Sequence, residues 1–159
     1  MVETLESFAK FFGVKISLNK NFVRKGNRYF LLDERLRALA KEISGWQFAG
    51  AYLGKNKNGK FYPSSLLLFM ITDQAENKII VDDKAAWLFV CGRDIFKEGI
   101  MRVYGSKTRG AYTLVLNKHG ECLGFGRITE NLDEAKEGVV VENVSDIGDF
   151  LRRERTPKQ

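Results

Sequence analysis

The sequence predicts an α+β protein of two small domains. Up to about residue 76, apolar residues recur at helical spacing, and short alternating runs between them indicate a small, mostly antiparallel sheet. Beyond that point strand-like runs dominate and follow one another through glycine-containing turns. The chain has 159 residues, 44% of them hydrophobic, which is enough for two small cores. We therefore expect an N-terminal α/β domain over 1–76, packed on a C-terminal β-barrel with short helices over 77–159.

The first half alternates helices and strands. The helix over 33–44 has the strongest signal, because Asp33 can cap its start and Gly45 can end it. The apolar stripe of this helix consists of Leu36, Leu39, Ala40 and Ile43. The segment 66–75 could be a buried helix or a buried strand. In chain order we expect helix 1–12, strand 14–18, a possible short strand 22–24, strand 28–32, helix 33–44, strand 46–53, a basic loop 54–60, a return strand from Phe61 and helix 66–75.

The second half follows the order strand, short helix, turn, hairpin, strand, short helix, which indicates a small closed β-structure. Asp82 or Asp83 can cap the first helix and Gly92 can end it. We expect strands over 78–81, 111–117, 121–128 and 138–142, a turn at Lys118–Gly120, a polar loop over 129–137 and a closing helix over 145–154. The closing helix is expected to pack through Ile147, Phe150 and Leu151.

The net charge of +6 and the pI of about 9.3 favour an anionic partner, most often nucleic acid. One histidine and two cysteines nearly exclude a Cys/His zinc site, and we expect Cys91 and Cys122 to be reduced core residues. No apolar run approaches the roughly 20 residues that a membrane-spanning helix needs. We expect an intracellular monomer with no membrane partner, no metal and no cofactor.

Gly54–Lys60 matches most of a phosphate-binding G-x-x-x-x-G-K loop, but Phe61 replaces the hydroxyl that would bind magnesium. The required helix does not follow, so Asn58-Gly59 is better explained as a hairpin turn. The lysines of this hairpin could contact RNA phosphate or could simply be solvated. Gly124-Phe-Gly126 lies inside a strand pattern and indicates a bulge or a close backbone approach rather than a dinucleotide site.

Two groups of cations are the candidate binding residues. The first is the C-terminal group Arg152, Arg153, Arg155 and Lys158, in which Arg152 and Arg153 are expected to face water. The second is Arg102, Lys107 and Arg109. Clustered guanidiniums bind phosphate, and Tyr104 and Tyr112 could supply stacking surfaces for single-stranded RNA. The alternatives are a solubilising helix end and core tyrosines. His119 has no apparent catalytic partners and no catalytic residue is proposed.

The stretch IIVDDKAAWLFVCGRDIFKEGIMRV at 79–103, followed by LNKHGECLGFGRI at 116–128, resembles a PUA domain. PUA domains are RNA-binding modules of pseudouridine synthases and archaeosine transglycosylases. The resemblance lies in the strand–helix start, the glycine that ends the helix, the turn at Gly99-Ile100 and the hairpin that ends in Gly124-Phe-Gly126-Arg127. It implies that the C-terminal barrel is of PUA type.

Both halves together resemble the Nip-seven family of large-subunit ribosome biogenesis factors. The resemblance is carried by RYFLLDERLRALAKEISG, by LGKNKNGKF and by the ending VSDIGDFLRRE. It implies binding of RNA, expected to be single-stranded ribosomal RNA, binding of pre-ribosomal assembly proteins, and no catalysis. The protein would act in the cytoplasm of an archaeon or in the nucleus and nucleolus of a eukaryote. Two alternatives stay open: a PUA-containing RNA-modification enzyme or accessory protein, for which Asp33 is the only catalytic candidate in the first half, and a translation factor that binds tRNA or the small subunit.

Overall fold

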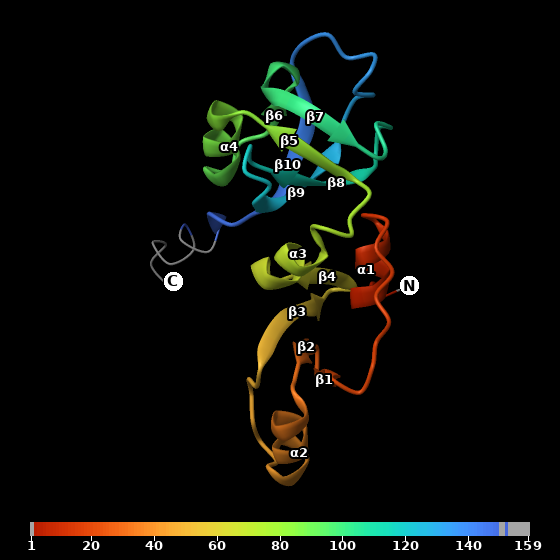
Figure 1. The fold of residues 1–159 in the computed structure, drawn as a ribbon, viewed down its shortest axis with the longest axis vertical. Helices are drawn as coiled ribbons and strands as arrows, with labels where there is room; N and C mark the ends of the chain where they lie inside the picture. The colour runs from red at the N-terminus through yellow and green to blue at the C-terminus, as the bar shows by residue number, and fades with distance from the viewer. Residues whose placement is uncertain (1, 150–151, 153–159) are drawn as a thin grey trace. The chain divides into compact units, whose positions relative to one another are not determined.

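The computed structural model describes residues 2–149 and 152, and the chain divides into two compact units (Figure 1). The first unit runs to Lys10 and from Val14 to Ile71, and the second contains Phe11–Gly13 and the chain from Thr72 onward. Both units combine helices with a sheet, so the fold class is α+β, as predicted. The domain boundary expected after Glu76 stays a prediction.

The first unit is built on an antiparallel four-stranded sheet in the order β1-β2-β3-β4. Its elements are α1 (Leu5–Lys10), β1 (Phe22–Lys25), β2 (Arg28–Leu31), α2 (Glu34–Glu42), β3 (Ala51–Lys57), β4 (Lys60–Pro63) and α3 (Ser65–Ile71). Asp33 caps α2, because its carboxylate accepts a hydrogen bond of 2.8 Å from the Leu36 amide. Asn58 and Gly59 both have positive φ, of 51° and 78°, and make the two-residue turn between β3 and β4.

Three expectations for this unit are wrong. The alternating segment 14–18 forms no strand, and no described strand pairs with it. The strand expected over 46–53 begins only at Ala51, because Trp46 and Phe48 pack their rings on Phe30 instead of alternating in the sheet. The strand then continues through the expected basic loop to Lys57. Helix α2 has the predicted stripe, but no residue of the helix is buried.

The second unit is a curled six-stranded sheet in the order β6-β10-β9-β8-β5-β7, which forms a half-barrel. Its elements are β5 (Lys78–Val81), α4 (Asp83–Val90), β6 (Ile95–Phe96), the 3₁₀ turn η1 (Lys97–Gly99), β7 (Ile100–Tyr104), β8 (Tyr112–Leu116), β9 (Cys122–Ile128) and β10 (Val139–Asp146). Only β5 and β8 pair in parallel; the other neighbours are antiparallel. Phe89 of α4 is fully buried among strand residues such as Ile79 and Val115, which fixes the helix on the half-barrel.

An aspartate and a glycine determine two local features of this unit, the start of α4 and the close approach of β9 to β10. Asp82, not Asp83, caps α4 by accepting a hydrogen bond of 2.8 Å from the Ala85 amide. Gly124 has φ of 143°, and a Cβ atom there would lie 2.0 Å from the Ser145 carbonyl oxygen of the neighbouring strand. Gly124 is therefore a close backbone approach at an irregular part of the β9–β10 pairing, as predicted.

Two further expectations need correction. The closing helix does not begin at Ser145, because β10 extends to Asp146 and pairs there with Gly124. Ile147 is exposed rather than packed in the core, and Phe150 and Leu151 lie outside the described residues. Cys91 is also exposed, at the C-terminal end of α4, whereas Cys122 is partly buried. Among the described residues no helix is long and apolar enough to cross a membrane.

Candidate functional site

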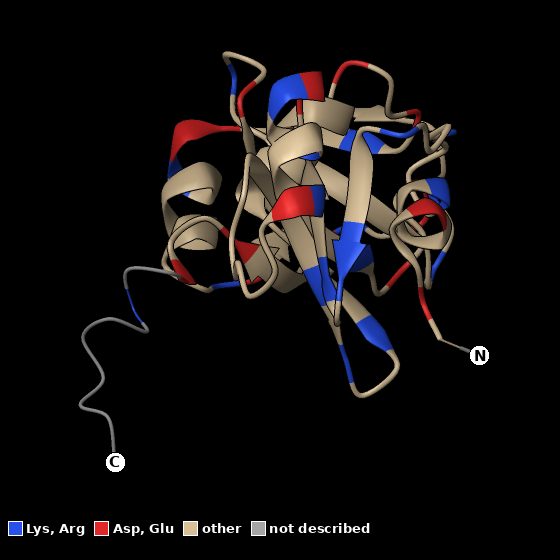
Figure 2. Cartoon of the chain, turned by 90° about the horizontal axis from the view of Figure 1, so that it is seen from below, with Lys and Arg blue, Asp and Glu red and all other residues tan. Residues whose placement is uncertain are grey.

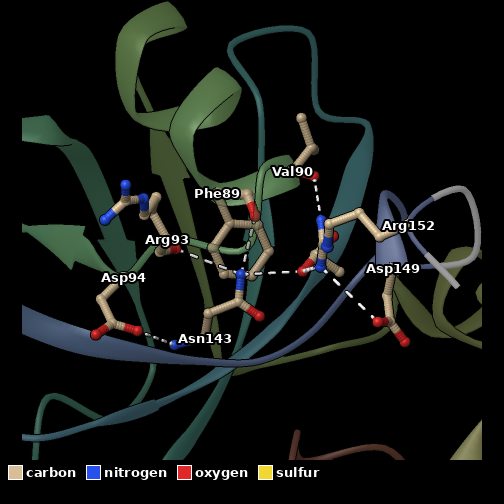
Figure 3. Close-up of polar contacts among 8 residues, drawn as sticks. Phe89, Val90, Arg93, Asp94, Asn143, Asp149 and Arg152 are labelled. Carbon is tan, nitrogen blue, oxygen red and sulfur yellow. Dashed lines mark hydrogen bonds and ion pairs between the residues drawn. The ribbon is translucent and has the colours of Figure 1, made fainter. Parts of the chain in front are cut away.

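The end of β10 holds an ion pair between Asp146 and Arg152 (Figure 3). The Asp146 side chain is only 2% exposed. Arg152 donates to both of its carboxylate oxygens, from Nη1 at 3.1 Å and from Nη2 at 2.8 Å. Arg152 Nη1 also donates to the Val90 carbonyl oxygen at 2.7 Å, in the last turn of α4. A cation at this position satisfies a helix-end carbonyl and complements the negative end of the helix dipole.

Asn143 completes this network from the middle of β10 (Figure 3). Its side-chain amide donates to the Phe89 carbonyl at 2.8 Å and to Asp146 at 3.1 Å. Its backbone amide donates to Asp94 Oδ1 at 2.8 Å. Asn143 therefore ties β10 to the C-terminal end of α4 and to the segment that follows α4.

Local sequence makes this network possible. A Cβ atom on Gly148 would lie 2.0 Å from the Val90 carbonyl oxygen, so only glycine allows the chain to pass the end of α4 so closely. The hydrogen bonds from Arg152 to Asp146 raise the pKa of the Arg152 guanidinium above its usual value, so it stays charged. The ending that we singled out in the sequence thus supplies a structural clamp, formed by Asp146, Gly148 and Arg152.

Arg152 is exposed, as predicted, but its guanidinium is also hydrogen-bonded within the protein, which was not expected. Sequence reasoning assumed a helix beginning at Ser145, which would turn Arg152 outward; the longer strand places it against α4 instead. A contact between Arg152 and RNA stays a prediction, and it would have to accompany or replace these bonds. Arg153, Arg155 and Lys158 lie outside the described residues.

The second predicted group lies on β7 and in the loop after it. Arg102 is exposed on β7, and its hydrogen bond with Tyr104, of 3.4 Å, raises the pKa of the guanidinium. Lys107 pairs with Asp133 at 2.9 Å, which ties its loop to the loop before β10. Arg109 is exposed and makes no hydrogen bond or ion pair with the described part of the chain.

The two tyrosines of this group have different roles. Tyr104 is partly exposed, with the Lys78 ammonium 5.9 Å from its ring centroid, so its face remains a candidate stacking surface. Tyr112 packs against Phe11 at 5.0 Å and Phe125 at 6.1 Å between centroids. Tyr112 is therefore a tyrosine that packs within the protein, the alternative to a stacking surface for RNA.

Arg152, the one described member of the C-terminal group, is not brought together with Arg102, Lys107 and Arg109. In Figure 1 the loop after β7 lies at the right of the second unit, whereas α4, which Arg152 contacts, lies at its left. Arg102 and Arg109 are one candidate site, and the C-terminal cations are another.

Side chains that could do acid–base or metal chemistry have other roles. His119 is exposed in the β8–β9 turn, where its backbone amide donates to Asn117 Oδ1 at 3.0 Å. Asp33 and Asp82 are helix caps. Burial raises the pKa of the Cys122 thiol, so it is a poor nucleophile near neutral pH. No group of three or more potential metal ligands occurs among residues 2–149 and 152.

A further set of cations lies in the first unit, and sequence reasoning identified only its members in the 54–60 hairpin. The strands carry two Lys or Arg residues in β1, one in β2, two in β3 and one in β4, and no Asp or Glu. The turns β1–β2 and β3–β4 lie at the same end of the sheet, and the hairpins at the lower centre of Figure 2 carry these cations. The turn signals at Gly26-Asn27 and Asn58-Gly59 could have revealed this grouping, because two adjacent antiparallel hairpins have their turns at the same end of the sheet.

Comparison with known proteins gives a family match and full-length relatives. Residues 77–155 match the family model described as the UPF0113 PUA domain. A UPF0113 protein of Archaeoglobus fulgidus is 30% identical over 92 residues, covering 55% of this chain and 52% of that protein, about half its length. The 60S ribosome subunit biogenesis protein NIP7 homolog of Pongo abelii is 25% identical over 165 residues, covering 95% of this chain and 92% of the relative.

Solved structures match the fold. A conserved PUA domain protein from Thermoplasma acidophilum has a TM-score of 0.60 at 20% identity and covers 96% of this chain and 92% of that one. A PUA domain from Aeropyrum pernix, solved as a tartrate complex, has a TM-score of 0.51 at 25% identity and covers 59% of this chain and 56% of that one. The arrangement of elements in both units therefore recurs in known proteins.

Proposed function

Because residues 77–155 match the family model described as the UPF0113 PUA domain, we propose that this protein is a non-catalytic RNA-binding factor in ribosome biogenesis. The chain is homologous, along 95% of its length, to proteins named as 60S ribosome subunit biogenesis factors. On that basis we assign it to assembly of the large subunit and processing of its precursor RNA. Its partners are single-stranded ribosomal RNA and other assembly proteins, in the cytoplasm of an archaeon or the nucleolus of a eukaryote.

The observation that carries RNA binding is the exposed cation group beside Tyr104. Arg102 and Arg109 have no described carboxylate partner within ion-pair distance, and Tyr104 lies next to Arg102 with part of its ring exposed. Cations bind phosphates, and an exposed ring stacks on an unpaired base. Lys107 can join them if RNA displaces Asp133. We place a second set of phosphate contacts at Arg152, Arg153, Arg155 and Lys158.

The roles of the candidate catalytic groups support a non-enzymatic protein. An RNA-modifying enzyme needs a poised acid, base or nucleophile. Asp33, the candidate in the first half, instead accepts a hydrogen bond from the Leu36 backbone amide of the helix that it caps. Asp146, the most buried acid among the described residues, is held by Arg152 and Asn143. One oxygen of Asp33 and both oxygens of Asp146 accept hydrogen bonds that stabilise the fold.

Sedimentation of native cell extract, followed by immunoblotting for this protein across the gradient, tests the proposal. We expect the protein in fractions with precursors of the large subunit, and we expect RNase treatment to release it. A position with the small subunit or with free tRNA would favour the translation-factor alternative. Incubating the purified chain with ribosomal RNA and the usual methyl donor, then analysing nucleosides by mass spectrometry, tests the enzyme alternative; a new modified nucleoside would overturn the non-catalytic assignment.

A further inference from the structure

The first unit presents a sheet face on which cations and aromatic rings meet. We define this cation–aromatic face by Lys25, Arg28, Lys55, Trp46, Phe48 and Tyr52. We propose that the cation–aromatic face binds single-stranded RNA, with a base stacked on Phe48 and phosphates bound by the three cations. The choice of RNA rests on the proposed function, whereas the geometry of the face does not.

The strand register places the three cations in one row. Lys25 of β1 pairs with Arg28 of β2, and Arg28 pairs with Lys55 of β3. Residues paired across strands lie on the same face of a sheet, with neighbouring strands about 4.8 Å apart. The row therefore crosses three strands with one positive charge on each. Lys57 and Lys60, which pair with each other beyond it, extend the positive surface toward the β3–β4 turn.

Such a row is unfavourable without an anion. Like charges directly opposite each other in a sheet repel, and the sheet strands contain no Asp or Glu to balance them. The nearby acid Glu3 is engaged elsewhere, because its carboxylate accepts the Phe61 backbone amide at 2.9 Å. Lys25, Arg28 and Lys55 form no ion pair with any carboxylate in the described part of the chain. A chain of phosphates would supply the missing negative charge.

An aromatic cluster adjoins the row on the same face. Phe30, two residues after Arg28, is fully buried beneath the rings of Trp46, Phe48 and Tyr52, with centroid distances of 5.4, 5.7 and 5.7 Å. The Lys25 ammonium lies 4.1 Å from the Trp46 ring centroid, and the Arg28 guanidinium lies 4.8 Å from that of Phe48. The cations and rings therefore form one continuous surface rather than two neighbouring ones.

Phe48 is the ring best placed for a ligand. It is 60% exposed, although it packs edge-on against both Phe30 and Tyr52. Trp46 is anchored beside it, because the indole N–H donates to the Ala40 carbonyl at 3.1 Å. A supported, exposed ring next to cations is the arrangement that binds single-stranded nucleic acid, whose bases stack while its phosphates pair with cations. An acidic peptide would satisfy the cations but would leave the exposed ring without a matching partner.

Fluorescence anisotropy of the full chain with a labelled 12-nucleotide single-stranded RNA of mixed sequence tests the proposal. The variant Phe48→Ala should bind the RNA roughly 5- to 100-fold more weakly, the effect expected for losing one stacked base. Phe48→Leu keeps apolar cover over Phe30 without an aromatic face and should lose a similar factor. The control is Phe69→Ala, which removes an aromatic side chain that is 67% exposed on α3 of the same unit.

Replacing Lys25, Arg28 and Lys55 together with Gln should make the slope of log affinity against log salt shallower by up to about 2, at about 0.7 for each phosphate contact. The matched control replaces Lys10, Lys15 and Lys41 with Gln; these residues are exposed and lie outside the sheet. The control should change the salt slope less than the replacement of Lys25, Arg28 and Lys55. A direct signal comes from Trp46, which becomes the only tryptophan in Trp87→Phe. Its fluorescence should be quenched at the same RNA concentrations that saturate the anisotropy.

The outcomes separate this proposal from the proposed function. If the wild-type chain binds the RNA but both Phe48 variants bind equally well and Trp46 is not quenched, the cation–aromatic face is not an RNA site, and RNA binding by the PUA domain stands. If the wild-type chain binds no RNA, the proposed function fails as well. Competition by poly-glutamate that depends on the three cations but not on Phe48 would assign the face to an acidic protein segment and overturn the proposal.

Discussion

The guanidinium of Arg152 binds both carboxylate oxygens of Asp146, at 3.1 and 2.8 Å, while one of its nitrogens also holds the last turn of α4. Arg152, one of the candidate RNA-binding residues in the sequence, is therefore part of the framework of the second unit. Because Asp146 is almost entirely buried, the ion pair with Arg152 offsets the cost of removing its carboxylate from water. Arg152 thus fixes where the chain leaves β10.

Arg152→Ala should lower the melting temperature, because it leaves the buried Asp146 carboxylate without its ion-pair partner. Arg152→Lys should restore only part of the loss, since an ammonium cannot reproduce two parallel hydrogen bonds. Thermal unfolding followed by circular dichroism measures both. Arg109→Ala is the control, as Arg109 is exposed and has no partner among the described residues. Equal melting temperatures for Arg152→Ala and Arg109→Ala would show that the ion pair does not stabilise the fold.

Gly148→Ala should destabilise the second unit by about 1–3 kcal/mol, because the new methyl group would overlap the Val90 carbonyl oxygen. Gly138→Ala provides a comparison, since Gly138 has φ of 83° but open space around its Cα. That variant should show only the cost of positive φ, of about 1 kcal/mol. Urea unfolding gives both free energies. A smaller loss for Gly148→Ala than for Gly138→Ala would argue against close passage of the chain at α4.

The two cysteines should differ in reactivity. Cys91 is exposed, whereas burial raises the pKa of Cys122, so iodoacetamide at pH 8 should alkylate Cys91 first. The raised pKa also means that the folded state retains the Cys122 proton longer than the unfolded chain. The stability due to this thiol is complete below the unfolded pKa of about 8.5 and is lost as pH rises above it. Mass spectrometry of tryptic peptides checks the order; faster labelling of Cys122 would contradict the buried placement.

The C-terminal cations should contribute to RNA affinity without supporting the fold if Arg152 is kept. Replacing Arg153, Arg155 and Lys158 with alanine should make the salt slope for single-stranded RNA shallower by up to about 2, at about 0.7 for each contact. Adding Arg152→Ala should lower stability as well, so the quadruple variant would mix two effects. Anisotropy at several salt concentrations, with a melting curve for each variant, separates them. An unchanged slope in the triple variant would place the RNA contacts elsewhere, first at Arg102 and Arg109.

Local signals predicted most of the fold because the deciding interactions are short in sequence. The Asp33 cap bonds the amide three residues later, and Asn58-Gly59 adopts the positive φ values of a two-residue turn. The strand–helix–hairpin order of the second unit follows from such signals. The alternation at 14–18 failed as a predictor because a strand also needs a neighbour, and none of the described strands pairs with that segment.

The candidate sites were harder to predict because they depend on register and on distant partners. The bond between Arg152 and Val90 spans 62 positions, and no local pattern reveals it. Sequence reasoning identified the lysines of the β3–β4 hairpin but not their alignment with Lys25 and Arg28, which depends on how three strands pair. Phe48 was assigned to a strand, where alternation would have hidden its role as an exposed ring over Phe30.

Ultraviolet crosslinking of the protein to RNA in its own cells, followed by sequencing of the bound fragments, tests the central claim most directly. We predict that the fragments map to large-subunit ribosomal RNA and its precursor, and that they cluster at single-stranded positions. Recovery no higher than from uncrosslinked cells, or fragments that map to tRNA or to small-subunit RNA, would contradict a role in assembly of the large subunit.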